Sequence, residues 1–179
     1  MLKPWLSPPP PAYDPYRPWL TYPGSLTRRI VSRSRRFRVE RRFQGARLPS
    51  RDEARMLGLR DGQFAHVREV ILFADETPVV FAHSVTAMRD IKGSWRGVGK
   101  LGSRPLAAAL FANPRVRRFP LEYRQISRRH HLHARVRSAS LSPPPALWAR
   151  RSLFQLRGRP LLVTEVFLPA ILRLPHQAE

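Results

Sequence analysis

A single carboxylate in an otherwise apolar strand is the feature that most constrains the fold of this chain. Residues 161–169 read Leu-Leu-Val-Thr-Glu-Val-Phe-Leu-Pro. Strand alternation places Glu165 on the same face as Val163 and Phe167, and the opposite face is also mostly apolar. We therefore expect protein to cover both faces and Glu165 to be buried. A buried carboxylate is costly unless it has a partner or a function. An ion pair with an arginine and a functional role both stay open at this point.

Strand patterns recur along the chain with only short helical signals between them. Alternation, turn residues and runs of β-branched residues predict a half-buried strand and two hairpins, with two more strands before the last hairpin. These segments are 36–43, the hairpin 64–86, the strands within 116–137, and the hairpin that pairs 148–156 with 161–168 across Arg157-Gly158-Arg159. This order predicts an α+β fold with a single antiparallel β-sheet and short helices.

Capping signals predict the helices. Ser50 followed by Glu53 forms a capping box, which should open a short helix that ends near Gly58. Ser103 is expected to cap a second helix over 104–111 that Asn113-Pro114 stops. Residues 93–102 are expected to form a glycine-containing loop, and 142–145 a break.

The first 23 residues are rich in proline and are expected to form an arm of their own, residues 1–23, ahead of one domain, residues 24–179. Proline excludes a regular helix or a central strand there. Aromatic side chains could dock parts of this arm on the domain; they are Trp5, Tyr13, Tyr16 and Trp19.

The charge of the chain is strongly positive, with a formal net charge of +21 and a pI of about 11.9. Such a charge suggests a polyanionic partner. The cations are nearly all arginine, however, and they are dispersed along the chain rather than gathered in one arm. We therefore expect non-specific binding of nucleic acid at low salt and no specific nucleic-acid partner. The same positive field would attract a small dianionic substrate.

Several classes of protein are poorly supported by the composition. There is no cysteine, which excludes disulfides and thiolate chemistry. No apolar run is long enough to cross a bilayer, and the first residues do not resemble a signal peptide. A cytoplasmic monomer with no membrane insertion is the expectation.

Arg68 repeats the pattern of Glu165, because it is a charged residue inside an apolar strand. It shares a face with Val70 and Leu72, while Glu69 points to the other side. The planar guanidinium of arginine suits a carboxylate. Arg68 is therefore expected either to pair with Glu165 or another acid, or to anchor a carboxylate of a ligand.

The histidines give a weaker signal. His130, His131 and His133 cluster in an arginine-rich segment, where only His131 and His133 would share a strand face and no acid lies nearby in sequence. This predicts a basic surface turn rather than a metal site. His66 and His83 are isolated and are expected to be structural. No nucleotide-binding, serine-hydrolase or zinc-protease motif is present, so we expect a pocket that uses no cofactor and no metal.

Several blocks of the sequence resemble the chorismate pyruvate-lyase family, and the final hairpin is the most specific of them. The likeness extends discontinuously over about residues 15–170, whereas the proline-rich start and the arginine-rich segment 128–137 depart from the family pattern. The blocks are Arg68–Asp75, Leu101–Leu106, Leu147–Ser152, Pro160–Pro169 and, less closely, 18–20 with 24–27.

This resemblance implies a fold and an activity. The family has a single antiparallel sheet whose helical flaps close over an internal ligand pocket. Its members convert chorismate to 4-hydroxybenzoate and pyruvate without a cofactor, the first committed step towards ubiquinone in many bacteria. By position, Arg68 matches the family's ligand-binding arginine and Glu165 its acidic residue. Leu106 and Leu26 match two positions that bind substrate largely through the backbone. A non-catalytic small-molecule sensor domain of the same fold is the alternative.

Overall fold

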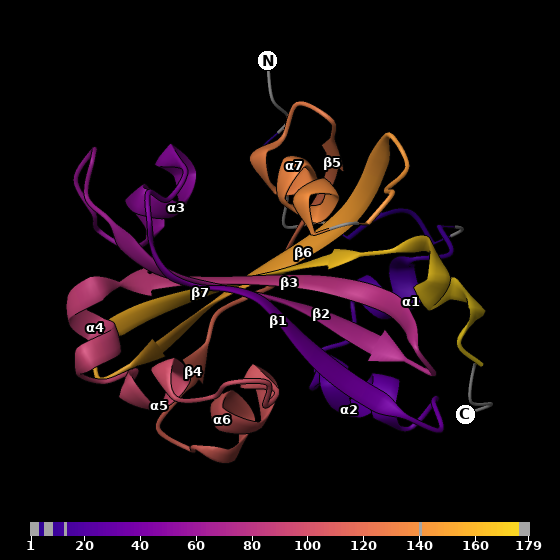
Figure 1. The fold of residues 1–179 in the computed structure, drawn as a ribbon, viewed down its shortest axis with the longest axis horizontal. Coiled ribbons are helices and arrows are strands. Elements are labelled where there is room, and N and C mark those ends of the chain that lie inside the picture. Colours follow the sequence, from indigo (N-terminus) through magenta and orange to yellow (C-terminus); the bar gives the residue numbers. More distant parts are fainter. Residues whose placement is uncertain (1–3, 6–8, 13, 140, 176–179) are drawn as a thin grey trace.

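One antiparallel sheet of seven strands forms the centre of the molecule (Figure 1). The computed structural model describes residues 4–5, 9–12, 14–139 and 141–175. The strands follow the order β1-β2-β3-β7-β6-β4, and β5 also pairs with β6. This confirms the predicted α+β class with a single antiparallel sheet. The strands are β1 (Phe37–Arg47), β2 (Ala65–Ala74), β3 (Thr77–Ala87), β4 (Arg117–Arg118), β5 (Glu122–Ser127), β6 (Ala146–Leu156) and β7 (Arg159–Phe167).

Two tight turns fix the register of the central strands. Asp75 and Glu76 join β2 to β3 with φ of 47° and 65°, and Arg157 and Gly158 join β6 to β7 with φ of 52° and 74°. Positive φ at both central positions matches the right-handed twist of paired strands. Both predicted hairpins are confirmed. The register then sets Ala82 of β3 and Arg150 of β6 on either side of Glu165 of β7.

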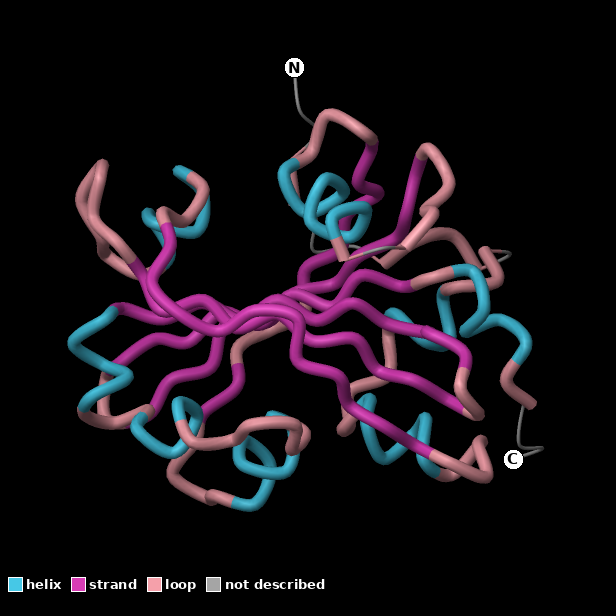
Figure 2. The backbone as a smooth tube through the Cα atoms, in the orientation of Figure 1, coloured by secondary structure: helices cyan, strands magenta, loops and turns pink. Residues whose placement is uncertain are grey.

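Short helices cover both faces of the sheet. Figure 2 shows α3 and α7 on one side and α2, α5 and α6 on the other. Within the described ranges, every helix is too short or too polar to cross a bilayer. The helices are α1 (Arg17–Leu20), α2 (Leu26–Val31), α3 (Arg51–Met56), α4 (Met88–Lys92), α5 (Arg96–Gly99), α6 (Leu106–Ala112), α7 (His131–Ser138) and the 3-10 helix η1 (Pro169–Arg173).

Three sequence-based expectations about local structure were wrong. Residues 131–138 form α7 rather than a strand, because Leu132 and Val136 recur at helical spacing and pack together against the sheet. Part of the expected loop 93–102 forms α5. The helix after it begins at Leu106 with Pro105 as its N-cap, so Ser103 caps nothing.

The proline-rich arm contains the one-turn helix α1, which we did not expect. Trp19 and Leu20 of this helix are buried in the core beside α2, at 1% and 0% exposure. Trp5 packs at the other face, near α7. Tyr13 lies outside the described residues. The described aromatic residues of the arm therefore tie it to both faces of the sheet.

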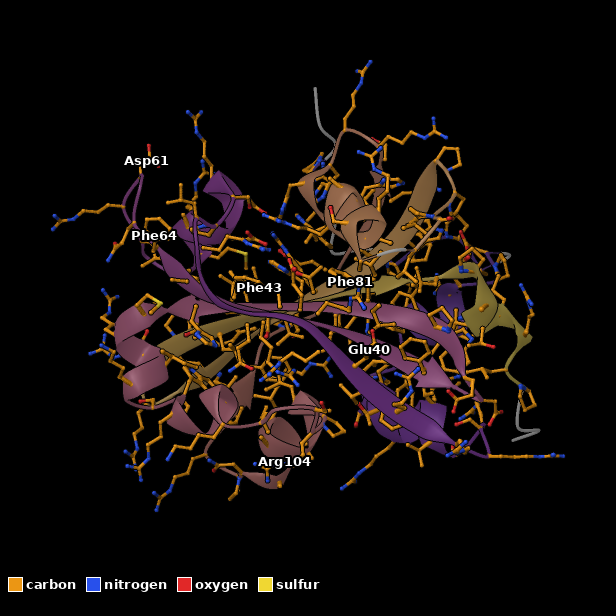
Figure 3. All side chains as sticks on the ribbon, in the orientation of Figure 1. Glu40, Phe43, Asp61, Phe64, Phe81 and Arg104 are labelled. Atoms are coloured by element: carbon orange, nitrogen blue, oxygen red, sulfur yellow. The ribbon has the colours of Figure 1, made fainter. Side chains whose placement is uncertain are left out.

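The two faces of the sheet differ in character. On the side of α2 and α6, two apolar clusters leave a cavity between them. On the side of α3 and α7, two other clusters flank buried charged groups. Figure 3 shows Phe43 and Phe81 on this second side and Arg104 beside α6 on the first.

His83 is the centre of the buried charged cluster. Its Nε2 lies 3.0 Å from Glu53 Oε1, and its Nδ1 lies 3.2 Å from Glu69 Oε1. Glu53 also completes the predicted capping box of α3 through Ser50, which is confirmed. The expectation that His83 is isolated was wrong, since two acids from α3 and β2 converge on it. His131 was likewise expected far from acids, but its Nε2 lies 3.8 Å from Glu53.

This cluster predicts a loss of stability in mild alkali. Burial lowers the pKa of His83, but the adjacent carboxylates of Glu53 and Glu69 outweigh it and raise that pKa to about 9, from 6.5. The folded state therefore holds this proton more tightly than the unfolded state, so the stabilisation is complete below pH 6.5 and is lost as pH rises towards 9. Melting temperatures measured from pH 6 to 10 should fall by several degrees over this window. The fall should be smaller in His83→Gln; an equal fall in both proteins would contradict the prediction.

Candidate active site

Arg68 projects from β2 into the cavity and is 2% exposed. Its Nη2 donates to the carbonyl oxygens of Gly102 at 3.1 Å and Arg104 at 2.9 Å, so the segment before α6 fixes the guanidinium. Its Nε has no hydrogen-bond partner within the described residues. Burial, with a smaller contribution from Arg41, lowers the pKa of Arg68 to about 10. The group remains charged at neutral pH, with no carboxylate paired to it in the described part of the chain.

Glu165 lines the same cavity from β7. Its Oε2 accepts a hydrogen bond of 2.5 Å from Nε of Arg150 on the adjacent strand. The side chain is 19% exposed, so Glu165 is only partly buried, contrary to expectation. Of its apolar neighbours on the same face, Val163 lines the cavity, whereas Phe167 is buried in the core. The ion pair that we considered between Arg68 and Glu165 is also absent, because Arg150 is the partner of Glu165.

Arg150 connects Glu165 to the N-terminal segment. Its side chain is 1% exposed, and its Nη1 donates to the carbonyl oxygens of Trp19, Leu20 and Tyr22 at 3.1, 3.2 and 2.7 Å. Charge-assisted hydrogen bonds of this kind fix both partners. Arg150 therefore holds Glu165 in one orientation and holds the chain that leads into α2 over the cavity.

Residues from one face of the sheet and from the helices α2 and α6 line the cavity. Figure 1 shows these two helices on the same side of the sheet. The empty space between the lining atoms has a volume of about 660 Å³, which includes the part that is open to solvent. The structure brings all four predicted site residues together here: Arg68, Glu165, Leu26 and Leu106. The other residues of the wall are mostly apolar or small; they are Gly24, Thr27, Val70, Leu72, Ala82, Ser84, Pro105, Ala107, Leu110, Phe111, Arg118, Arg150, Ser152, Phe154 and Val163.

Leu26 and Leu106 occupy equivalent positions, because each is the first residue of its helix. Ser25 caps α2 by accepting from the amide of Arg28 at 3.3 Å, and Pro105 precedes α6. Both leucine side chains are buried, at 2% and 9% exposure. The amides at the first turn of a helix have no partner within the helix. Both residues can therefore offer an apolar side chain and a backbone donor at the cavity.

The charges of the cavity wall do not cancel. Arg68, Arg118 and Arg150 line it, whereas Glu165 is its only carboxylate among the described residues. Sequence reasoning missed Arg118 and Arg150. Residue type could not show which of Arg150 and Arg151 faces the cavity. Strand alternation relative to the predicted partner strand could have assigned Arg150 to the cavity side. An enclosed apolar site with a surplus of fixed cations suits a small anion that carries more than one negative charge.

The histidine pair His131 and His133 lies far from this cavity, on α7 across the sheet. The two residues do not share a strand face as expected. His133 is buried, with Nε2 2.8 Å from the carbonyl oxygen of Pro144, whereas His131 faces Glu53. Both residues therefore make structural contacts on the opposite face of the sheet.

The fold is shared with ligand-binding domains of transcription regulators. One example is the ligand-binding domain of a putative GntR-family transcriptional regulator from Bordetella bronchiseptica. It is similar over 80% of this chain and 88% of that chain, with a TM-score of 0.54 and 16% sequence identity. At this level of sequence identity, the likeness shows a shared fold and not a shared function.

Sequence comparison is more specific. The family model for chorismate lyase matches residues 6–174. A protein named probable chorismate pyruvate-lyase from Aromatoleum aromaticum is 54% identical over 176 residues, covering 96% of this chain and 95% of that protein. One of the same name from Azoarcus sp. is 53% identical over 178 residues, covering 96% and 93%. The chain belongs to the chorismate lyase family.

Proposed function

We propose that this protein is a chorismate pyruvate-lyase that converts chorismate to 4-hydroxybenzoate and pyruvate, the first step of ubiquinone biosynthesis. The observation that carries the proposal is Arg68, a buried guanidinium without a carboxylate partner in the described residues, aimed into an apolar cavity. Family membership gives the substrate class. Chorismate is a dianion on a six-membered ring, which fits the surplus of positive charge.

The reaction needs little chemistry from the protein. The ether bond to the enolpyruvyl group breaks, and the ring carbon that bears the hydroxyl group loses its proton. The ring becomes aromatic, and the leaving enolpyruvate takes up a proton to become pyruvate. Because aromatisation supplies the driving force, the site has to orient the substrate, assist proton movement and exclude water.

The site residues divide these tasks in our proposal. The free edge of the Arg68 guanidinium binds the ring carboxylate, and the backbone at Leu106 and Leu26 closes the site around the ring. Arg150 occupies Oε2 of Glu165. This leaves Oε1 of Glu165 to contact the hydroxyl end of the ring and to relay a proton.

Turnover tests the function directly. Purified protein mixed with chorismate should produce 4-hydroxybenzoate and pyruvate in equal amounts, followed by ultraviolet absorbance and by a coupled pyruvate assay. Stoichiometric binding of chorismate without any product would favour the sensor-domain alternative. Failure to bind chorismate at all would exclude the lyase and would leave a sensor domain for a different small molecule.

Activity should not depend on a metal ion, because the proposed steps use only the side chains and backbone of the cavity. We expect the initial rate after exhaustive chelation to stay within about twofold of the untreated rate. Loss of activity on chelation, with recovery when one divalent metal is added back, would contradict this mechanism.

A further inference from the structure

Two guanidinium groups of the cavity lack a carboxylate partner among the described residues. Arg68 of β2 is one, and Arg118 of β4 is the other. Arg150 differs from both, because its Nε is paired with Glu165 and its Nη1 binds three carbonyl oxygens. Since β2 and β4 are separated in the sheet by β3, β7 and β6, the two unpaired cations approach the cavity from opposite sides.

Arg118 is fixed in place without being neutralised. Its Nε donates to Oγ of Ser152 at 3.2 Å, and its Nη1 donates to the carbonyl oxygen of Pro23. The guanidinium carbon also lies 5.4 Å from the ring centre of Phe154 and 5.5 Å from that of Phe111. Neutral acceptors and aromatic rings orient the group, and Nη2 makes no hydrogen bond to a described residue. Burial, together with nearby Arg150, lowers the pKa of Arg118.

The sheet register places the two cations at the ends of one row. Arg68 pairs with Ser84 on β3, which pairs with Val163 on β7, which pairs with Ser152 on β6. The guanidinium of Arg118 contacts Ser152 at the far end of this row, through its hydrogen bond to Oγ. Strands lie about 4.8 Å apart, so the row from β2 to β6 spans about 14 Å between backbones, before the arginine side chains reach inwards. The remaining space suits a small ligand with an anionic group at each end.

Glu165 lies between these ends, two residues along β7 from Val163 and on the same face. A ligand held by Arg68 and Arg118 would therefore present its middle to this carboxylate. The cavity thus has two cationic ends and a central acidic group, all within one apolar enclosure.

We propose that Arg118 binds the second carboxylate of the substrate, the one that leaves with the enolpyruvyl group. Arg118 is then the residue by which the site distinguishes the dianionic substrate from the aromatic product, which keeps only the ring carboxylate. This inference rests on the proposed function. It implies that elimination removes the partner of Arg118 while the contact to Arg68 persists in the product.

The test compares two ligands on the same variant, Arg118→Gln. Calorimetry would measure the Kd of 4-hydroxybenzoate, which has one carboxylate, and of 3-(carboxymethoxy)benzoate, a stable compound with two. We expect the affinity for the dicarboxylate to fall about tenfold or more, as on loss of a charge-assisted hydrogen bond, with KM for chorismate rising in parallel. Affinity for 4-hydroxybenzoate should change less than about threefold. Because both ligands bind the same folded molecules, a change in stability cancels from the ratio.

Arg117→Gln is the matched control, since it removes the same charge from the neighbouring position of β4, where the side chain is exposed and stacks on Phe119. Its ligand ratio should equal that of the unaltered protein. Equal losses for both ligands in Arg118→Gln, or no loss for either, would overturn the inference. If Arg118→Gln does not fold, Arg118→Lys decides by the same ratio, with a smaller expected loss for the dicarboxylate. Turnover of chorismate by the unaltered protein tests the proposed function separately.

Discussion

Glu165→Gln should lower kcat for chorismate by about 100-fold or more, the usual effect of losing a group that transfers a proton. The substitution keeps the shape of the side chain and leaves an oxygen that can still accept the hydrogen bond from Arg150. It removes the negative charge and the ability to accept a proton. KM should change much less than kcat, because the ring carboxylate is bound elsewhere in our proposal. Initial rates of 4-hydroxybenzoate formation measure both constants.

A control variant and a stability measurement are needed to interpret the loss of kcat in Glu165→Gln. Glu40→Gln makes the same chemical change on β1, where Glu40 pairs with Arg38 and Arg42 outside the cavity, and it should leave kcat unchanged (Figure 3). The melting temperature of Glu165→Gln shows whether Arg150 stays in place. Near-normal turnover by a folded Glu165→Gln protein would remove Glu165 from the chemistry and leave it as a support for Arg150.

Arg68→Lys should raise KM for chorismate by about tenfold and weaken the binding of 4-hydroxybenzoate by a similar factor. Lysine keeps the charge but cannot hold Gly102 and Arg104 with one nitrogen while presenting others to a carboxylate. Since substrate and product both carry the ring carboxylate, the loss should be common to both, and kcat should fall less than KM rises. Steady-state kinetics and calorimetry on one preparation give these values.

The competing account of Arg68 is purely structural. If the guanidinium only supports the segment before α6, Arg68→Lys should lower the melting temperature while the affinity of the folded protein for 4-hydroxybenzoate stays unchanged. Arg42→Lys is a control for the general effect of the substitution on a strand, because Arg42 is bound to Glu40 away from the cavity. Unchanged product affinity in Arg68→Lys would remove this residue from the site.

The sequence contained enough information to predict the sheet and two of the charged residues of the cavity. Local rules sufficed for the hairpins, because a turn such as Arg157-Gly158 requires positive φ, and for α3, where Ser50 and Glu53 cap each other. Arg68 and Glu165 could be singled out because a charge inside an apolar strand needs a partner or a purpose.

Other features depend on contacts between distant parts of the chain, which no local pattern encodes. Arg150 is the partner of Glu165 only because β6 and β7 pair in this register and because the carbonyl groups of residues 19–22 close over it. In a chain so rich in arginine, its residue type carried no signal. His83 also looked isolated, since its acids come from α3 and β2. The segment that forms α7 was predicted to be a strand, because its basic and apolar residues also alternate along the sequence.

A crystal structure with 4-hydroxybenzoate tests the central claim most directly, namely that the cavity beneath α2 and α6 is the place of reaction. We predict one product molecule there, with its carboxylate on the guanidinium of Arg68 and its hydroxyl group within hydrogen-bond distance of Glu165. Arg118 should not touch it. Product bound outside this cavity, or bound inside it with the hydroxyl group on Arg68 and the carboxylate near Glu165, would contradict the account.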